Sequence, residues 1–363
     1  MYQGTIHADK VIAYLSVAVS FVVCLLLTPF LIKLFVRLRM IDEGGGRKIH
    51  KGIVPTMGGT GVFIAIMSTL AIMWDNVEMN MQTRYVIGAI SVMFLLGFTD
   101  DAIDLRASRK LFVMIIVASL VYMSGIRIDS LFGFFGVYGL PSGVSYAVTV
   151  FTIIVVTNAF NLIDGIDGLA GGIGIVSMAF FALWFVLSGD KTFAILCSSI
   201  VGALAAFLRY NWAPARIFMG DTGSLFIGMI SAICAIKFIN QNIALDPSDP
   251  LKFKGAVAAG CVLVMYPMYD TLRVFIIRML EGRSPMSPDT QHTHHYLLRF
   301  GFSHSKATMV ILIADTVAII FFGVLSYFVT SFYVVPLMLL TSLAVSLWLK
   351  RRERQIKHVH TAI

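Results

Sequence analysis

The stretch SGVSYAVTVFTIIVVTNAFNLIDGIDGLAGG, residues 142–172, joins an apolar run of membrane-spanning length to a compact polar cluster. The run itself covers residues 142–161, and a bilayer crossing needs about 20 apolar residues. The cluster contributes four amide or carboxylate side chains: Asn158, Asn161, Asp164 and Asp167. Ionisable groups beside a membrane segment cost free energy, so their clustering indicates a functional site. The alternative interpretation is a polar turn between two helices, with Asn and Asp as helix caps.

The composition is that of a membrane protein. Of the 363 residues, 58% are hydrophobic and 13% are charged, whereas soluble domains carry about 25% charged residues. The net charge of +8 raises the question of nucleic acid binding. The basic residues sit in short loops between apolar runs and form no contiguous face, so nucleic acid is excluded as a partner.

Apolar runs recur along the chain and leave no room for a soluble domain. We predict a single all-α polytopic membrane domain, residues 1–363, with about eleven transmembrane helices. The glycine-rich segment 126–141 ends at a proline, which predicts one short extracytoplasmic hairpin in place of a span. The expected spans are 11–38, 57–74, 84–99, 110–125, 142–161, 168–188, 191–210, 223–240, 255–280, 307–330 and 332–349.

The distribution of Lys and Arg predicts the orientation. With eleven spans and the N-terminus outside, 21 of the 28 Lys and Arg residues fall on the cytoplasmic side and 7 on the other. Cytoplasmic loops of membrane proteins carry such an excess, so we predict an N-out, C-in topology.

Under this orientation every polar cluster lies on the cytoplasmic face. Helix ends on one face of a membrane can converge, and their carboxylates, amides, lysines and histidines would form a site for a cation and phosphate. The polar cluster of 158–172 is one of five such loops. The other four are RKIHKGIVPTMGG (47–59), FTDDAIDLRASRK (98–110), RYNWAPARIFMGDTGS (209–224) and RMLEGRSPMSPDTQHTHH (278–295).

Two of these loops carry the carboxylates best suited to a metal. Asp100 and Asp101 are adjacent, and like charges that close favour a bound Mg²⁺ or a base beside a metal. Asp221 stands between glycines immediately before an apolar run, where a helix N-terminus would favour phosphate and the carboxylate could hold its metal. The alternatives are a solvated helix end for the pair and a helix cap for Asp221.

Two further loops carry cationic or imidazole side chains. His292, His294 and His295 lack the spacing of a zinc site and have no nearby cysteine, so they suit phosphate binding better, with a solvated loop as the alternative. The second group is Lys48, His50 and Lys51. These residues could close over an anion, although the ordinary excess of positive charge in cytoplasmic loops would also explain them.

The ordered motifs PTMGG, DDAID, NAFNLIDGIDGLAGG, FMGDTGSLFIG and GRSPMSPDTQHTHH resemble those of the polyprenyl-phosphate N-acetylhexosamine-1-phosphate transferases. Within that superfamily the chain resembles the bacterial undecaprenyl-phosphate GlcNAc-1-phosphate transferases. Its HTHH is closer to the HxHH of this branch than to the three consecutive histidines of the phospho-MurNAc-pentapeptide translocases. The resemblance covers about residues 45–300.

The resemblance implies roles for individual residues. Asp221 and Asn161 would be ligands of Mg²⁺, with Mn²⁺ as an alternative ion. Asp100 would deprotonate the lipid phosphate, with Asp101 beside it for metal or geometry. The remaining implied residues are substrate contacts: Lys48, His50, Lys51, Lys110, Asn158, Asp164, Asp167, Arg283, His292, His294 and His295.

The implied reaction transfers GlcNAc-1-phosphate from UDP-GlcNAc to undecaprenyl phosphate in the bacterial cytoplasmic membrane, with release of UMP. The expected partners are these two substrates and the lipid bilayer, with a homodimer left open. Transfer of another UDP-N-acetylhexosamine and the pentapeptide translocase reaction are the enzymatic alternatives. A CDP-alcohol phosphotransferase is disfavoured because Gly171 stands where that family requires arginine. A transporter is also disfavoured, because the polar groups lie at one face and not at the membrane midplane.

Overall fold

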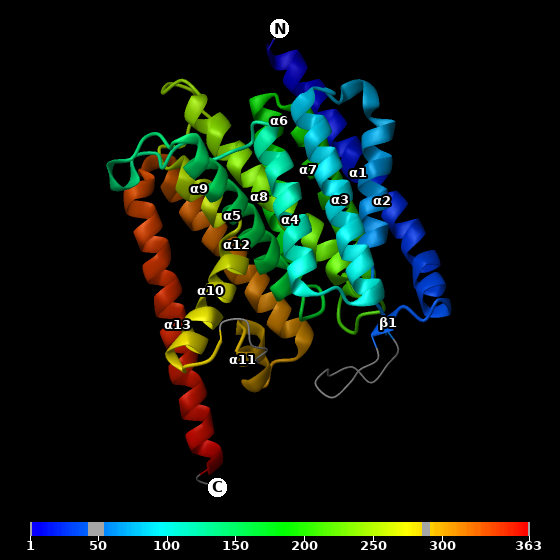
Figure 1. Ribbon diagram of the computed structural model, residues 1–363, viewed down its shortest axis with the longest axis vertical. Coiled ribbons are helices and arrows are strands. Elements are labelled where there is room, and N and C mark those ends of the chain that lie inside the picture. The colour runs from blue at the N-terminus through cyan, green and yellow to red at the C-terminus, as the bar shows by residue number, and fades with distance from the viewer. Residues whose placement is uncertain (1, 43–53, 285–290, 362–363) are drawn as a thin grey trace.

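The computed structural model describes residues 2–42, 54–284 and 291–361. They form an elongated bundle of helices, with one two-residue ladder between β1 (Ile41–Asp42) and β2 (Val54–Pro55). The termini lie at opposite ends of the bundle (Figure 1), as an odd number of spans requires. The described helices are α1 (Tyr2–Arg37), α2 (Gly59–Ile72), α3 (Met81–Ile103), α4 (Ala107–Met123), α5 (Ser142–Ile163), α6 (Leu169–Ser188), α7 (Lys191–Asn211), α8 (Gly220–Ala244), α9 (Ala256–Val262), α10 (Met265–Leu280), α11 (Thr293–Arg299), α12 (His304–Phe328) and α13 (Ser331–Thr361).

The all-α polytopic class is confirmed. Each of the eleven expected apolar runs contains a helix or a bent helix pair. Among the described residues, 8 helices are long and apolar enough to cross a membrane, or 9 if the bent pair counts as one span. With 14 and 17 residues, α2 and α4 fall short of that length. The eleven-span count and the N-out orientation therefore stay predictions.

The run 255–280, expected as one straight span, is broken into α9 and α10 at an angle of 74°. Pro267 stands in the first turn of α10 and has no N–H, so it cannot donate to the carbonyl of Leu263. That carbonyl instead accepts the hydroxyl of Ser177 at 2.6 Å. The bend is thus stabilised by a neighbouring helix, and it carries α10 away from the direction of α9.

Helix α8 forms the centre of the bundle and positions the site. It packs against α3 and α5, and most of its side chains are buried. Small residues allow close approach, since a Cβ on Gly228 would lie 3.0 Å from the backbone of Thr157 in α5. The beginning of α8 therefore lies deep among its neighbours, at the end of the bundle away from the N-terminus (Figure 1).

The segment between α4 and α5 lies at the end of the bundle that carries the N-terminus (Figure 1). It turns back on itself, with Leu140 N–H donating to the carbonyl of Asp129 at 2.9 Å and Gly133 N–H to that of Val137 at 3.0 Å. It is a short closed loop around the 3₁₀ turn Phe134–Gly136, in agreement with the predicted hairpin.

Candidate active site

The first turn of α8 is held by close backbone contacts with α2 and α3. Gly58 N–H donates to Phe218 O at 2.8 Å, and Gly59 N–H donates to Met219 O at 3.0 Å. A Cβ on Gly59 would collide with the backbone of residues 222–223, and a Cβ on Gly97 of α3 would collide with the backbone of Asp221. Glycine is therefore required at both positions for α8 to begin where it does.

Asp101, at the end of α3, caps α8 from a different helix. Its Oδ1 accepts the N–H of Asp221 at 3.0 Å. Its Oδ2 accepts the N–H and the hydroxyl of Thr222 at 2.9 and 2.6 Å. The carboxylate oxygens of Asp101 are therefore acceptors for N–H groups that would otherwise be unpaired at the beginning of the helix. Of the adjacent pair, Asp101 is thus the residue that holds the geometry.

Asp100 and Asp221 share the ammonium group of Lys110. Lys110 Nζ lies 3.0 Å from Asp221 Oδ2 and also forms an ion pair with Asp100. Asp100 is buried, with 7% of its side chain exposed, whereas Asp221 is 24% exposed. Leu105 N–H donates to the other oxygen of Asp100 at 2.9 Å. Two neighbouring carboxylates with one cation between them form the electrostatic centre of the site.

The α5–α6 loop adds an amide and a third carboxyl group to this centre. Asn161 Nδ2 donates to Asp221 Oδ1 at 2.7 Å and to Ser224 Oγ at 2.9 Å. Burial, together with the negative charges of Asp221 and Asp101, raises the pKa of Asp164 well above its usual value. The N–H of Gly220 donates to the same carboxyl and opposes this shift.

The same side chains could hold a divalent cation. The described residues contain no group of three or more His, Cys, Asp or Glu side chains arranged for a metal. Mg²⁺, however, is usually held by one or two carboxylates and completed by substrate phosphates. Asp221 and Asp100 meet that requirement, and Lys110 marks a place between them where positive charge is favoured.

Two of the predicted substrate contacts, Asn158 and Asp167, have hydrogen-bond partners within the protein. Asn158 Nδ2 donates to the carbonyl of Ile154 in its own helix at 2.8 Å. Asp167 is buried, and its Oδ2 accepts the N–H of Ala215 at 3.0 Å. Its carbonyl accepts the hydroxyl of Thr308 at 2.9 Å. Asp167 therefore ties the α5–α6 loop to the α7–α8 loop and to α12.

Of the histidines of HTHH, His294 lies against the α5–α6 loop. The rings of His294 and His295 are 4.2 Å apart between centroids, and a Cβ on Gly165 would lie 3.4 Å from His294 Cε1. Burial and the neighbouring His295 lower the pKa of His294 to about 3, so its imidazole is neutral at physiological pH. His292 Nδ1 lies 2.8 Å from Asp270 Oδ2.

Of the other predicted substrate contacts, Arg283 lies on an exposed turn and three residues fall outside the described part of the chain. Arg283 Nε donates to Glu281 Oε2 at 3.0 Å on an exposed turn after α10. Lys48, His50 and Lys51 lie outside the described residues.

Two residues that the sequence reasoning missed organise the site. Asn211 accepts the N–H of Gly168 at 3.0 Å and donates to the carbonyl of Ile217 at 2.9 Å, which joins two site loops. Asp270 is a fully buried carboxylate inside the apolar run 255–280. An ionisable group in a membrane segment is itself a functional signal, so Asp270 could have been found.

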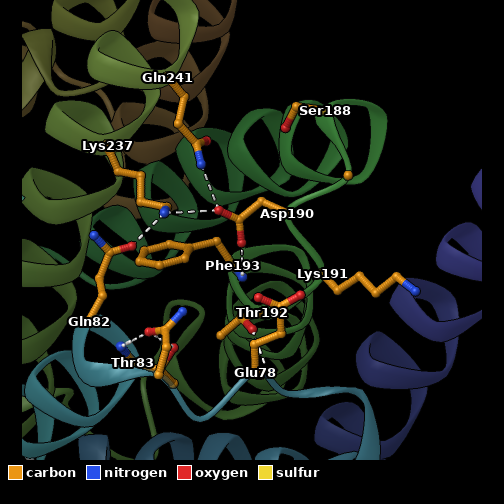
Figure 2. Close-up of a pocket in the computed structure, with 12 residues that line it drawn as sticks. Glu78, Gln82, Thr83, Ser188, Asp190, Lys191, Thr192, Phe193, Lys237 and Gln241 are labelled. Atoms are coloured by element: carbon orange, nitrogen blue, oxygen red, sulfur yellow. Dashed lines mark hydrogen bonds and ion pairs between the residues drawn. The ribbon is translucent and has the colours of Figure 1, made fainter. Parts of the chain in front are cut away.

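A second polar cavity, of about 270 Å³, lies between the beginnings of α3 and α7 and the second half of α8 (Figure 2). Two of its charged residues, Lys237 and Asp190, form an ion pair with each other. Lys237 Nζ lies 3.0 Å from Asp190 Oδ2 and 2.6 Å from Gln82 Oε1, and Gln241 Nε2 donates to Asp190 Oδ2 at 2.8 Å. Lys237 Nζ also lies 4.5 Å from the centre of the Phe193 ring. This network joins α3, α7 and α8 and stabilises their packing.

The fold and the site together define a polytopic membrane protein with a carboxylate, lysine and amide centre at one end of its bundle. Residues 83–239 match the model of glycosyl transferase family 4. A probable undecaprenyl-phosphate N-acetylglucosaminyl 1-phosphate transferase of Bacillus subtilis (strain 168) is 32% identical over 299 residues, which cover 81% of this chain and 79% of the relative. The chain belongs to this family of transferases.

Two other relatives come from different bacteria. The undecaprenyl-phosphate alpha-N-acetylglucosaminyl 1-phosphate transferase of Yersinia pestis is 27% identical, over 78% of this chain and 76% of the relative. The decaprenyl-phosphate N-acetylglucosaminephosphotransferase of Mycolicibacterium smegmatis is 29% identical, over 77% of this chain and 73% of the relative.

Proposed function

We propose that this protein transfers GlcNAc-1-phosphate from UDP-GlcNAc to undecaprenyl phosphate, giving undecaprenyl-diphosphate-GlcNAc and UMP. The observation that carries the proposal is the ammonium of Lys110 between Asp100 and Asp221, at the N-terminus of the central membrane helix. A helix N-terminus and a lysine favour a diphosphate, and carboxylates favour its metal. The names of the relatives supply the sugar and the lipid.

The transfer is a substitution at the β-phosphorus of UDP-GlcNAc. An oxygen of the lipid phosphate forms the new P–O bond, and the bond between the β-phosphorus and the bridging oxygen breaks, so UMP leaves with the electron pair. A phosphate monoester has a second pKa near 6, so the lipid phosphate is already largely ionised at pH 7 and needs little activation. A direct, one-step transfer in a ternary complex therefore suffices.

The residues of the site have distinct roles in this proposal. Asp221 and the amide oxygen of Asn161 would hold Mg²⁺, which would supply positive charge to neutralise the diphosphate and the leaving group. Asp100 orients the lipid phosphate and takes its remaining proton when it carries one. Lys110 turns from the two carboxylates toward the phosphates when the substrates bind, and Asp101 keeps α8 in place.

The polyprenyl tail requires an apolar path within the membrane. A cavity of about 380 Å³ with an almost entirely apolar lining lies between α5, α8, α9 and the segment 128–134, and Val156, Ile236 and Val264 are among its lining residues. Its lining from segment 128–134 and the second half of α8 places it toward the end of the bundle opposite the carboxylate centre, so it could hold only a part of the tail far from the phosphate.

The substrate is tested by a panel of UDP-sugars with purified full-length protein, undecaprenyl phosphate and Mg²⁺. Mass spectrometry of the lipid fraction should detect undecaprenyl-diphosphate-GlcNAc as the main product. A preference for UDP-MurNAc-pentapeptide, or for another N-acetylhexosamine, would contradict the proposed sugar. Uptake of a solute without any lipid product would indicate a transporter.

A further inference from the structure

Asp270 of α10 is the centre of a buried network that holds the beginning of α11. Its Oδ2 lies 2.8 Å from His292 Nδ1, and its Oδ1 accepts the N–H of Thr293 at 2.8 Å and the hydroxyl of the same residue. Arg273 Nη2 lies 3.3 Å from Oδ1 and also donates to the carbonyl of Gln291. Asp270 is 0% exposed, so no water competes for these bonds.

The network determines which nitrogen of His292 carries the proton. A carboxylate oxygen can only accept, and Oδ2 faces Nδ1 directly. The proton of the neutral imidazole must therefore be on Nδ1, and the lone pair must be on Nε2. Because Nε2 has no hydrogen-bond partner within the described residues, it is available to accept a hydrogen bond from a donor group of a ligand.

His292 is also connected to the carboxylate centre by packing. Its ring is stacked on that of His294 with centroids 5.8 Å apart and an angle of 7° between the planes. His294 in turn lies against Gly165, next to Asp164. His292 thus belongs to the histidine cluster that borders the site. Asp270 is bonded to its Nδ1, which leaves Nε2 for a ligand.

We propose that Asp270 is a positioning residue that fixes the Nδ1–H tautomer of His292, so that Nε2 accepts a hydrogen bond from a hydroxyl or amide N–H of the nucleotide sugar. The inference rests on the proposed function and makes it more specific. A lone pair on Nε2 repels phosphate oxygens, so this histidine recognises a donor group of the sugar or ribose and does not bind the diphosphate. A site that accepts from such a group discriminates strongly against ligands that lack it.

The first test reads the tautomer directly. The full-length protein, labelled with ¹⁵N-histidine, is compared with His292→Ala to assign the His292 signals. We expect Nδ1 protonated and Nε2 unprotonated in the ligand-free protein near pH 8. In Asp270→Asn, the amide N–H of Asn faces Nδ1 and the proton moves to Nε2. A proton on Nε2 in the wild-type protein would overturn the proposal, even if Asp270→Asn does not fold.

The second test separates positioning from a merely structural role. Binding of UDP-GlcNAc, UDP and UMP is measured by calorimetry. Asp270→Asn should weaken UDP-GlcNAc binding by about 10- to 100-fold, because it leaves a donor on the sugar nucleotide unpaired. Thr293→Val removes one bond to Asp270 but keeps the pair with His292, so binding should stay within about 3-fold of wild type. Equal losses in the two variants would contradict the proposal.

The ligand arms identify the recognised group. A donor on the sugar predicts that UDP and UMP binding is little changed by Asp270→Asn, whereas a ribose donor predicts equal losses for all three ligands.

The double variant Asp270→Asn/His292→Ala should bind no more weakly than His292→Ala, since Asp270 acts through that ring. Fully additive losses would overturn the inference. Failure of the proposed function is distinguishable, because absence of UMP release by wild type leaves the tautomer unaffected.

Discussion

Lys110 of α4 and Asp221 of α8 meet at 3.0 Å, although they lie 111 residues apart in the sequence. The contact joins the first turn of α4 to the N-terminus of α8, the most buried of the candidate spans among the described residues. It places an ammonium group where a diphosphate and its metal would bind. In the proposed reaction, this pair is the point at which the nucleotide sugar meets the membrane-embedded acceptor.

Replacement of Lys110 should impair turnover more than folding. Lys110→Met removes the ammonium that faces two carboxylates and, in the proposed complex, the phosphates, so we expect kcat to fall by about 100-fold. Arg109→Gln is the matched control, because it removes an exposed positive charge from the neighbouring position. UMP release by both purified variants measures the effect. Equal activities of the two variants would contradict the role of Lys110.

Asp101 should contribute to the stability of the site through its bonds to α8. Asp101→Ala leaves the N–H groups of Asp221 and Thr222 without their acceptor, which costs about 1–3 kcal/mol for each unpaired buried group. Asp101→Asn keeps one acceptor and should be less destabilising. Thermal unfolding in detergent, followed by size-exclusion chromatography, compares them. If Asp101→Ala unfolds at the wild-type temperature, the capping role is wrong.

Gly97 should tolerate no larger side chain. A Cβ at this position would overlap the backbone of Asp221, so Gly97→Ala must displace α8 from α3 and should cost about 1–3 kcal/mol together with most of the activity. Gly88 lies on the same helix with nothing within 4 Å of its Cβ position, and Gly88→Ala is the control. Comparable unfolding temperatures for the two variants would show that the close contact is not required.

The buried His294 predicts acid sensitivity. Its pKa is lowered from 6.5 to about 3, so between these values the unfolded chain binds a proton that the folded protein does not. The free energy of unfolding is therefore unaffected above about pH 6.5 and falls as the pH decreases through this window, by an amount on the order of a few kcal/mol. His294→Gln should flatten that part of the pH profile of unfolding. A variant profile parallel to that of wild type would disprove the prediction.

The sequence predicted the class of fold well because apolar runs and loop charges are both local signals. Each expected run contains a helix or, for 255–280, a bent pair. Pro267 is a local signal for the break, but the bond from the Ser177 hydroxyl to the carbonyl of Leu263 joins distant segments, and no local pattern contains it. The positions of Asp100, Asn161 and Asp221 near one another followed from placing their loops on one face.

The hydrogen-bond partners of the polar residues in the site could not be predicted from the sequence. The family resemblance assigned Asp100 to the lipid phosphate and Asp101 to metal or geometry, and only the packing of α3 on α8 shows that Asp101 caps the helix. The resemblance likewise implies a substrate contact for Asp167, and only the structure shows that its Oδ2 accepts the N–H of Ala215. Asp270 lies inside an apolar run and not in one of the polar loops, and its pairing with His292 is a contact between residues 22 positions apart that no local pattern contains.

The central claim is tested most directly by the stoichiometry of the reaction. Purified protein is incubated with UDP-GlcNAc labelled in the sugar and the β-phosphate, with and without undecaprenyl phosphate and Mg²⁺, and UMP and labelled lipid are counted. We expect one UMP for each labelled lipid, no release without the lipid phosphate, and a loss of several orders of magnitude in Asp221→Asn. UMP release without lipid phosphate, matched by label bound to the protein, would contradict direct transfer, and full activity of Asp221→Asn would contradict the site.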